Sequence, residues 1–371
     1  MDLALFYFLL LGFAIFMYVL LDGFDLGIGI LYPWFGEAGE RDHLMRSISH
    51  VWDGNETWLV FGGVILFAAF PVAYAEITST FYLPIMLMLF ALIFRGVAFE
   101  YRFKSDTSRP YWDLAFSAGS AIAAFCQGML LGSLVQGVPA GINSMSSLHW
   151  LTPFSVLTGF SVMAGYALLA ACYLYMKSRG SIQKHAAKLG VRLLVITLLA
   201  MVAVSLWTVV SQVEIRERWF SGYNFLWLSP LPILTCIAAA FAWKYLHAGR
   251  AAENHTVAES RTFAGSHTVA ESHTFDSTEV AGVQAVDPSR YESRPFWAVT
   301  LIFLLGFAGL VVGLFPYLLP RQLTFMDAAS PDSSLLFLLP GVCIFVPLIC
   351  AYTFWGYRVF AGKVEDYQEG Y

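Results

Sequence analysis

The chain alternates long apolar segments with short polar ones over most of its length. A membrane-spanning helix needs roughly 20 mostly apolar residues, and about nine segments meet that requirement. Only helices and closed barrels can span a bilayer, so the pattern predicts an all-α polytopic membrane protein with about nine transmembrane helices. The expected spans are residues 3–31, 52–76, 81–101, 112–137, 150–177, 190–213, 225–247, 296–318 and 335–358.

One polar stretch, residues 249–295, interrupts this pattern, and the hexapeptide HTVAES occurs in it at 255–260 and again at 267–272. A polar, repetitive stretch cannot bury enough apolar surface to form a core of its own. We therefore expect residues 1–248 to hold transmembrane helices 1–7. Residues 249–295 are then a cytoplasmic linker, and residues 296–371 hold helices 8–9 and a cytoplasmic tail.

Lysine and arginine are distributed unevenly among the loops. They occur after the third expected span (residues 102–109), after the fifth (177–188) and in the tail (358–363), whereas the loop VPAGINSMSSLH at 138–149 has none. Positively charged loops stay on the cytoplasmic side of a membrane. We therefore expect the N-terminus outside and the C-terminus in the cytoplasm.

Composition agrees with a membrane location and excludes one class of partner. Hydrophobic residues make up 58% of the 371 and charged residues only 13%, against about 25% charged in soluble domains. The net charge of −5 arises from few charges, which leaves no basic surface for nucleic acid. The five cysteines lie in apolar segments without CxxC spacing, which indicates buried thiols and predicts no metal site.

Two aspartates, Asp22 and Asp25, stand near the end of the first apolar segment in the sequence LDGFDLG. Residues three apart lie on one face of a helix, and a carboxylate in hydrocarbon is costly enough to indicate a function. If the span ended near Leu21, both groups would be solvated at the cytoplasmic surface. However, the apolar GIGILYPW continues beyond them, which favours burial and a role in carrying protons.

The second expected span opens with WDGNETW, in which Asp53 and Glu56 repeat the three-residue spacing. Arg95 at the end of the third span is the obvious counter-ion, because an unpaired arginine there would be expensive. Glu100 and Asp113 stand at the same level. We expect these groups to converge on the cytoplasmic half of the membrane, either as a structural ion pair or as a proton relay.

What the spans lack is also informative. Haem in a membrane bundle needs axial ligands such as histidine or methionine held well inside the spans. The histidines lie at span ends, in loops or in the polar stretch, so we expect this chain alone to bind no haem. A secondary transporter or proton-coupled channel would also carry intramembrane carboxylates. The fifth to ninth spans contribute almost no charge, which favours a subunit that depends on a partner.

Four motifs closely resemble one known family. They are LDGFDLGIG, HVWDGNETWLVFGGVILFAAFPVAYA, the FRGVAFEYR exit of the third span, and GLFPYLLP near the end. They resemble subunit II of cytochrome bd-type quinol:oxygen oxidoreductases, and the likeness extends from residue 3 to residue 363. The stretch 249–295 departs from the family pattern because it is longer than expected there.

The resemblance implies a complex in a bacterial inner (cytoplasmic) membrane. Its partner, subunit I, carries two b-type haems and the d-type haem, oxidises quinol at the outer side, and reduces oxygen with cytoplasmic protons. Small single-span accessory subunits often join the complex, and some members hold a structural quinone in subunit II. The implied fold is two four-helix bundles plus a peripheral helix, surrounded by membrane lipid.

The resemblance also assigns roles to single residues. The proton-route carboxylates of the family correspond to Asp25 and Asp53, with Asp22 and Glu56 beside them. Trp58 corresponds to a tryptophan near a proposed oxygen access route, and packing is the other role we consider for it. Arg95, Glu100 and Asp113 are expected to support the route through ion pairs, and no catalytic residue is expected in this chain.

Overall fold

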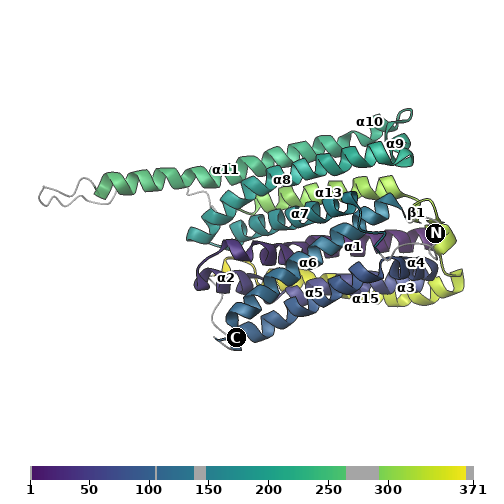
Figure 1. Cartoon of the computed structure of the whole chain (residues 1–371), viewed down its shortest axis with the longest axis horizontal. Helices are drawn as coiled ribbons and strands as arrows, with labels where there is room; N and C mark the ends of the chain where they lie inside the picture. Colours follow the sequence, from purple (N-terminus) through teal and green to yellow (C-terminus); the bar gives the residue numbers. More distant parts are fainter. Residues whose placement is uncertain (1, 105–106, 138–147, 265–291, 365–371) are drawn as a thin grey trace, which may run out of the picture.

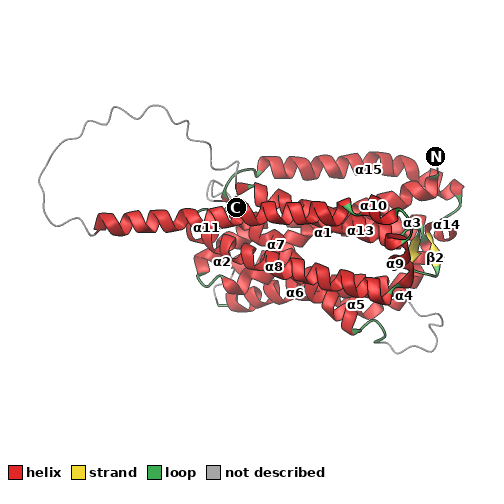
Figure 2. Cartoon of the chain, turned by 90° about the horizontal axis from the view of Figure 1, so that it is seen from above, coloured by secondary structure: helices red, strands yellow, loops and turns green. Residues whose placement is uncertain are grey.

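The structure is a computed structural model that describes residues 2–104, 107–137, 148–264 and 292–364, with side chains undescribed at 38 and 249–264. It confirms the all-α prediction (Figure 2). The helices are α1 (Leu3–Leu31), α2 (Ala38–Ile48), α3 (Trp52–Ala69), α4 (Pro71–Thr80), α5 (Tyr82–Tyr101), α6 (Arg109–Gln136), α7 (Pro153–Lys177), α8 (Gly180–Ser211), α9 (Val213–Phe220), α10 (Asn224–Leu228), α11 (Pro230–Ala264), α13 (Arg294–Leu314), α14 (Phe325–Ala328) and α15 (Asp332–Val359). Short 3₁₀ turns follow α1 and α5 at Tyr32–Trp34 and Arg102–Lys104.

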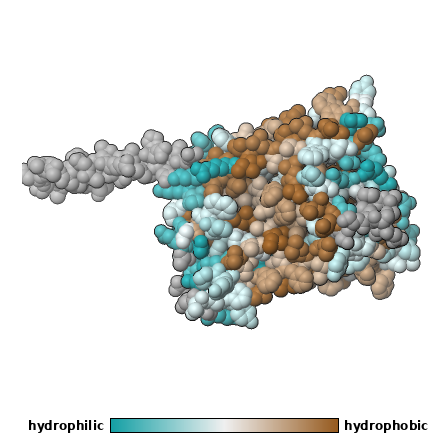
Figure 3. Space-filling model, in the orientation of Figure 1, coloured by the Kyte–Doolittle hydropathy of each residue, from teal (hydrophilic) through white to brown (hydrophobic). Residues whose placement is uncertain are grey.

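Within the described ranges, eight helices are long and apolar enough to cross a membrane. These candidate membrane spans correspond to α1, α5, α6, α7, α8, the α10–α11 pair, α13 and α15. Between their polar ends, the surface carries a broad apolar belt (Figure 3). Because the helices run across this belt, its position agrees with a bilayer around the middle of the molecule. The number nine stays a prediction.

The second expected span, 52–76, is divided into two helices. Proline lacks an N–H and favours the first position of a helix, so α3 gives way to α4 at Phe70 and Pro71. The first two turns of α3 carry Asp53, Asn55 and Glu56. This polar start explains why α3 does not count among the eight apolar helices.

The carbonyl groups at the end of α3 do not lack partners. Ser330, just before α15, donates its backbone N–H to the Ala69 carbonyl at 2.8 Å and its hydroxyl to the Ala68 carbonyl at 2.9 Å. At the same end of the molecule, the Tyr7 hydroxyl donates to the Leu335 carbonyl at 2.8 Å. The start of α15 is therefore joined to α1 and α3 by polar contacts.

Helix α1 lies in the middle of the arrangement (Figure 1), packed against α7, α6 and α3. Glycines allow the closest of these contacts. A β-carbon at Gly27 would lie 2.0 Å from the Tyr166 carbonyl oxygen of α7, and one at Gly29 would lie 2.1 Å from the Ser120 hydroxyl of α6. The end of α1 that carries Asp22 and Asp25 is consequently buried in protein.

Two features differ from the sequence-based expectation. Helix α13 ends at Leu314, and the chain turns into the hairpin β1 (Tyr317–Leu319) and β2 (Leu323–Thr324), where the expected span ran to residue 318. Helix α11 continues to Ala264, so the first HTVAES lies in a helix that projects from the bundle (Figure 1). The second copy lies outside the described residues, and the linker boundaries stay a prediction.

Candidate functional site

Arg95 of α5 is fully buried and faces three carboxylates. Its Nη1 lies 3.0 Å from Asp22 Oδ1 and 2.6 Å from Glu56 Oε1, and its Nη2 lies 3.8 Å from Asp25 Oδ2. Asp22 and Asp25 are fully buried, while the Glu56 side chain is 24% exposed. The solvated helix-end alternative for the two aspartates is therefore wrong, because α1 continues past both of them to Leu31.

Close packing of α6 against α5 helps to enclose Arg95. A β-carbon at Gly119 of α6 would lie 2.6 Å from the Ala91 carbonyl oxygen and 3.2 Å from the backbone nitrogen of Arg95. On another side, Trp52 stacks on Phe99 with ring centroids 4.9 Å apart, and the guanidinium lies 6.0 Å from each ring. These aromatic faces attract the cation and exclude lipid and solvent from it.

Asp25 has an amide donor of its own. Asn55 of α3 donates to Asp25 Oδ2 at 2.7 Å, and the Tyr357 hydroxyl of α15 donates to Asn55 Oδ1 at 3.0 Å. Asn55 is buried, so these bonds satisfy polar groups that would otherwise be costly. The sequence pattern assigned no role to Asn55 or to Tyr357, which is a single tyrosine in an apolar segment.

Asp53 is exposed in the first turn of α3. It is close enough to Glu56 for the two charges to interact. Asp53, Glu56 and the buried aspartates thus differ in exposure, from the surface to the fully enclosed interior. The structure brings Asp22, Asp25, Glu56 and Arg95 together, with Asp53 at the outer edge.

A family model described as cytochrome bd terminal oxidase subunit II matches residues 3–275 and 277–360 of the chain. The chain belongs to this family. The curated relatives it matches include a probable cytochrome oxidase subunit 2 from Haemophilus influenzae, 27% identical over 96% of this chain and 92% of that protein. Another is the cytochrome bd-I ubiquinol oxidase subunit 2 of Escherichia coli, 26% identical with the same shares covered.

The fold agrees with this assignment. The structure of bd oxidase from Geobacillus thermodenitrificans contains a chain that superposes with a TM-score of 0.69 at 16% identity, covering 97% of this chain and 99% of that one. As a cytochrome bd subunit II, the chain is an integral membrane protein and a subunit of a quinol oxidase. The family does not favour the transporter or channel alternative.

Two residues expected near Arg95 lie elsewhere in this subunit II. Glu100 is exposed and pairs with Lys104 at 3.5 Å, one turn along the end of α5. Asp113 accepts from Arg102 Nε at 2.5 Å and from the Tyr32 hydroxyl at 2.8 Å. Glu100 and Asp113 were expected near Arg95 because all three lie at the same depth in the membrane. Depth alone, however, does not determine which face of a helix a side chain occupies.

Asp113 belongs to a second charged cluster. Buried Arg102 also contacts Asp42 at 2.7 Å, and Arg109 contacts Asp42 at 2.9 Å, while Arg41 lies 3.4 Å from Asp113. Three arginines here meet two aspartates, and the carboxylates are only partly buried. This cluster joins α2 to α5 and α6, which fits a structural role at the end of the bundle.

Trp58 is fully buried in α3. It packs with Ala14 and Tyr18 of α1, and its ring meets Phe13 edge-on with centroids 5.5 Å apart. Trp58 lines neither the cleft between α3 and α15 nor the pocket beside Ala68. Its surroundings favour packing, and a part in oxygen access stays a prediction.

A cleft of about 270 Å³ lies between the start of α3 and the end of α15. Its walls include His50, Asn55 and Tyr357, so it reaches the donors that serve Asp25. Burial, reinforced by the Lys177 ammonium group, lowers the pKa of His50. The cleft thus extends from the surface of this chain to the Asn55 side chain.

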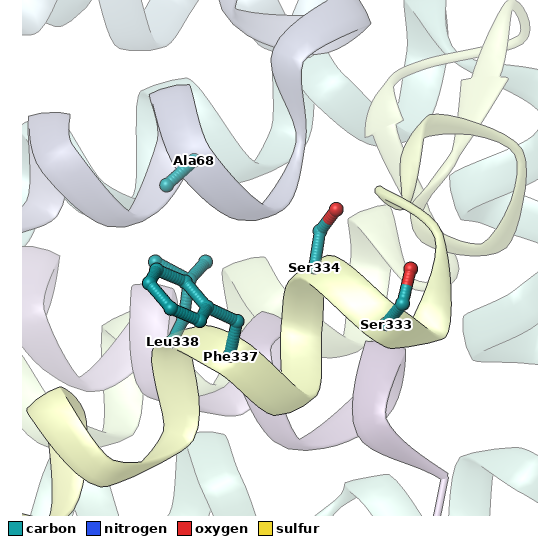
Figure 4. Close-up of a pocket in the computed structure, with 5 residues that line it drawn as sticks. All are labelled: Ala68, Ser333, Ser334, Phe337 and Leu338. Atoms are coloured by element: carbon teal, nitrogen blue, oxygen red, sulfur yellow. The ribbon is translucent and has the colours of Figure 1, made fainter.

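A second pocket, of about 300 Å³, is lined by Ala68 of α3 and by α15 residues (Figure 4). Its lining, Ser333, Ser334, Phe337 and Leu338, carries no charged side chain. Within the described residues, no group of three or more His, Cys, Asp or Glu side chains could hold a metal ion.

Proposed function

We propose that this subunit II takes up cytoplasmic protons at the Arg95 site for delivery to a haem-bearing subunit I. The names of the relatives support quinol as the reductant, and the resemblance supports a partner with two b-type haems and a d-type haem. Oxygen reduction in that partner consumes protons, which must cross apolar protein to reach it. The resemblance likewise supports a bacterial inner membrane, with the C-terminal end of α1 on the cytoplasmic side.

The observation that carries the proposal is the charge balance around Arg95. One guanidinium faces Asp22, Asp25 and Glu56, so full ionisation would leave an excess of two negative charges in a largely enclosed site. Uncompensated charge is expensive in such surroundings. Binding of protons by the carboxylates removes this excess, which gives the site the capacity to accept and release them.

The exposure of the carboxylates supports a direction for uptake. Asp53 is exposed, Glu56 is partly exposed, and Asp22 and Asp25 are enclosed. A proton collected at the surface can move inward along groups of decreasing exposure. Asp53 is then the entry residue, while Glu56 and Asp25 are the internal exchange groups.

The experiment compares amide variants in the assembled oxidase. Glu56→Gln and Asp25→Asn keep side-chain size but cannot titrate, so we expect oxygen consumption per haem to fall at least tenfold, by analogy with the loss of a general acid–base group. Glu100→Gln is the matched control, because it removes an exposed carboxylate outside the site. Full turnover in both site variants would mean that the carboxylates are structural and that protons enter through the partner.

A further inference from the structure

One amide side chain, that of Asn55 in α3, joins three helices. Its Nδ2 donates to Asp25 Oδ2 at 2.7 Å and, more weakly, to the Leu21 carbonyl at 3.4 Å, both on α1. Its Oδ1 accepts from the Tyr357 hydroxyl of α15 at 3.0 Å. An amide has two donor hydrogens and one acceptor oxygen. Both hydrogens and the oxygen of this buried side chain therefore have partners in the protein.

The partners of Asn55 determine which way its amide faces. An ionised carboxylate and a carbonyl oxygen accept hydrogen bonds and cannot donate them. Turning the amide round would bring its oxygen against both acceptors of α1, whereas the Tyr357 hydroxyl can serve either orientation. The amide hydrogens are therefore directed at α1, and Tyr357 supplies the remaining bond that holds the side chain there.

The two oxygens of Asp25 have different surroundings. Oδ2 accepts the hydrogen bond from Asn55 and lies 3.8 Å from Arg95 Nη2. Oδ1 is buried and has no hydrogen-bond partner among the residues that the structure describes. An amide hydrogen and a guanidinium thus face one oxygen, and the other oxygen is left without either contact.

This difference decides where a proton can bind. A neutral carboxyl group has one hydroxyl oxygen and one carbonyl oxygen, and the carbonyl oxygen is the better hydrogen-bond acceptor. A donor that stays in contact with one oxygen therefore makes that oxygen the carbonyl and leaves the proton to the other. The positive charge of Arg95 near Oδ2 acts in the same direction. In Asp25 both effects favour a proton at Oδ1.

The other groups around Asp25 do not remove this asymmetry. The titratable groups that face it are Arg95 of α5, Asp22 of α1, Glu56 of α3 and Tyr357 of α15. Among the described residues, the hydrogen bond to the Asp25 carboxylate comes from Asn55 alone. The acidic neighbours change how readily Asp25 takes up a proton, and the choice of oxygen is left to Asn55 and Arg95.

The cleft between α3 and α15 reaches this arrangement from outside. Asn55 and Tyr357 line the cleft, and Asp25 does not. An amide can pass a proton on only as an imidic acid, an unstable tautomer, so Asn55 separates the cleft from Asp25 without relaying protons. The proton at Oδ1 must then come from another side, which agrees with uptake through Asp53 and Glu56.

We propose that Asn55, held by Tyr357, reserves Asp25 Oδ2 as a hydrogen-bond acceptor and so confines the exchanged proton to Oδ1. This assignment rests on the proposed function of the Arg95 site as a place of proton uptake. Asn55 and Tyr357 are then positioning residues, which act through Asp25 without exchanging protons themselves.

Infrared difference spectroscopy of the assembled oxidase tests the position of the proton. The carbonyl stretch of a protonated carboxyl group lies at lower frequency when its carbonyl oxygen accepts a hydrogen bond. The Asp25 band is the one that Asp25→Asn removes. Asn55→Ala removes the donor to Oδ2 and should move this band to higher frequency. Tyr357→Phe keeps Asn55 but loosens it, and should move the band less in the same direction.

Tyr352→Phe is the matched control, because Tyr352 lines the same cleft and is 64% exposed, and it should leave the band in place. An assembled Asn55→Ala complex with an unmoved band would place the proton at Oδ2 and overturn the proposal. Absence of an Asp25 band at every pH at which the oxidase turns over would overturn it as well. If Asn55→Ala yields no haem-containing complex, Tyr357→Phe decides by the same criterion.

The two measurements separate this proposal from the proposed function. Full turnover in Asp25→Asn, together with a shifted band in Asn55→Ala, would refute proton uptake through Asp25 and leave the position of the proton standing. Lost turnover in Asp25→Asn, together with an unmoved band in Asn55→Ala, would support uptake and overturn the assignment of the proton to Oδ1.

Discussion

Arg95 Nη1 lies 3.0 Å from Asp22 Oδ1, and both side chains are completely enclosed by protein. Removal of one partner leaves a buried charge without compensation, which costs about 3–5 kcal/mol. Arg95→Ala should therefore reduce the yield of folded complex sharply, whereas Arg95→Lys should retain more of it. Haem content per membrane protein measures both. Normal yield of the alanine variant would show that the carboxylates are neutral in the resting protein.

Asp53 and Asp25 should act on one path if protons pass from the surface to the interior. Asp53→Asn and Asp25→Asn should each lower oxygen consumption while the complex still assembles. The double variant should lose less than the sum of the two effects, because either break already limits the flux. Additive losses would place the two residues on separate routes.

Trp58 should matter through its shape. Trp58→Phe keeps an aromatic ring in the enclosed site and should be mild, whereas Trp58→Ala removes most of the volume and should cost about 3–5 kcal/mol. The apparent oxygen affinity of each variant is measured beside its thermal stability. A changed oxygen affinity with unchanged stability in Trp58→Ala would support an access route, and no change in either would refute both roles.

Deletion of residues 252–290 should leave assembly and turnover near normal. Arg294 donates to the Tyr245 hydroxyl at 2.5 Å, so the chain is already held together a few residues outside the deleted stretch. A Gly/Ser segment of equal length serves as the control for chain length. If the deletion removes the complex from the membrane and the Gly/Ser segment does not restore it, the stretch has a specific role in assembly.

His50 predicts a dependence of stability on pH. Burial, with a further contribution from Lys177, lowers its pKa below the usual 6.5 in the folded protein. The unfolded chain therefore binds more protons below that pH, and stability falls as the pH drops from about 7 to 5. His50→Asn should lose less thermal stability over this interval than the wild type. An equal loss in both would assign the dependence to other groups.

The sequence indicated the helices and much of the Arg95 site for a physical reason. Apolar segments of membrane length, and ionised groups within them, carry large transfer energies that are visible residue by residue. Arg95, Asp22 and Glu56 could be connected because an unpaired charge there needs a partner. Glu100 and Asp113 lie at the same depth in the membrane and were therefore grouped with these residues. Their side chains project from other helix faces and contact other partners.

Other features depend on contacts that no local pattern reveals. Gln127, which donates to the Tyr18 hydroxyl, stands 109 positions from it, and Tyr357 stands 302 positions from Asn55. Each is a single polar residue in an apolar helix, where a tyrosine or amide can equally well face lipid headgroups or another subunit.

The contacts of α15 have a consequence for the order in which the molecule is completed. Within the bilayer, helices gain little from burying apolar surface against one another, so polar contacts decide where a late helix docks. Helix α15 meets the earlier helices through Ser330 at one end and Tyr357 at the other. Until α15 is inserted, Asn55 lacks its hydroxyl donor and the end of α3 lacks the contacts from Ser330. The hydrogen bonds around Asn55 are therefore completed only when α15, which follows the other described helices in the chain, has been inserted.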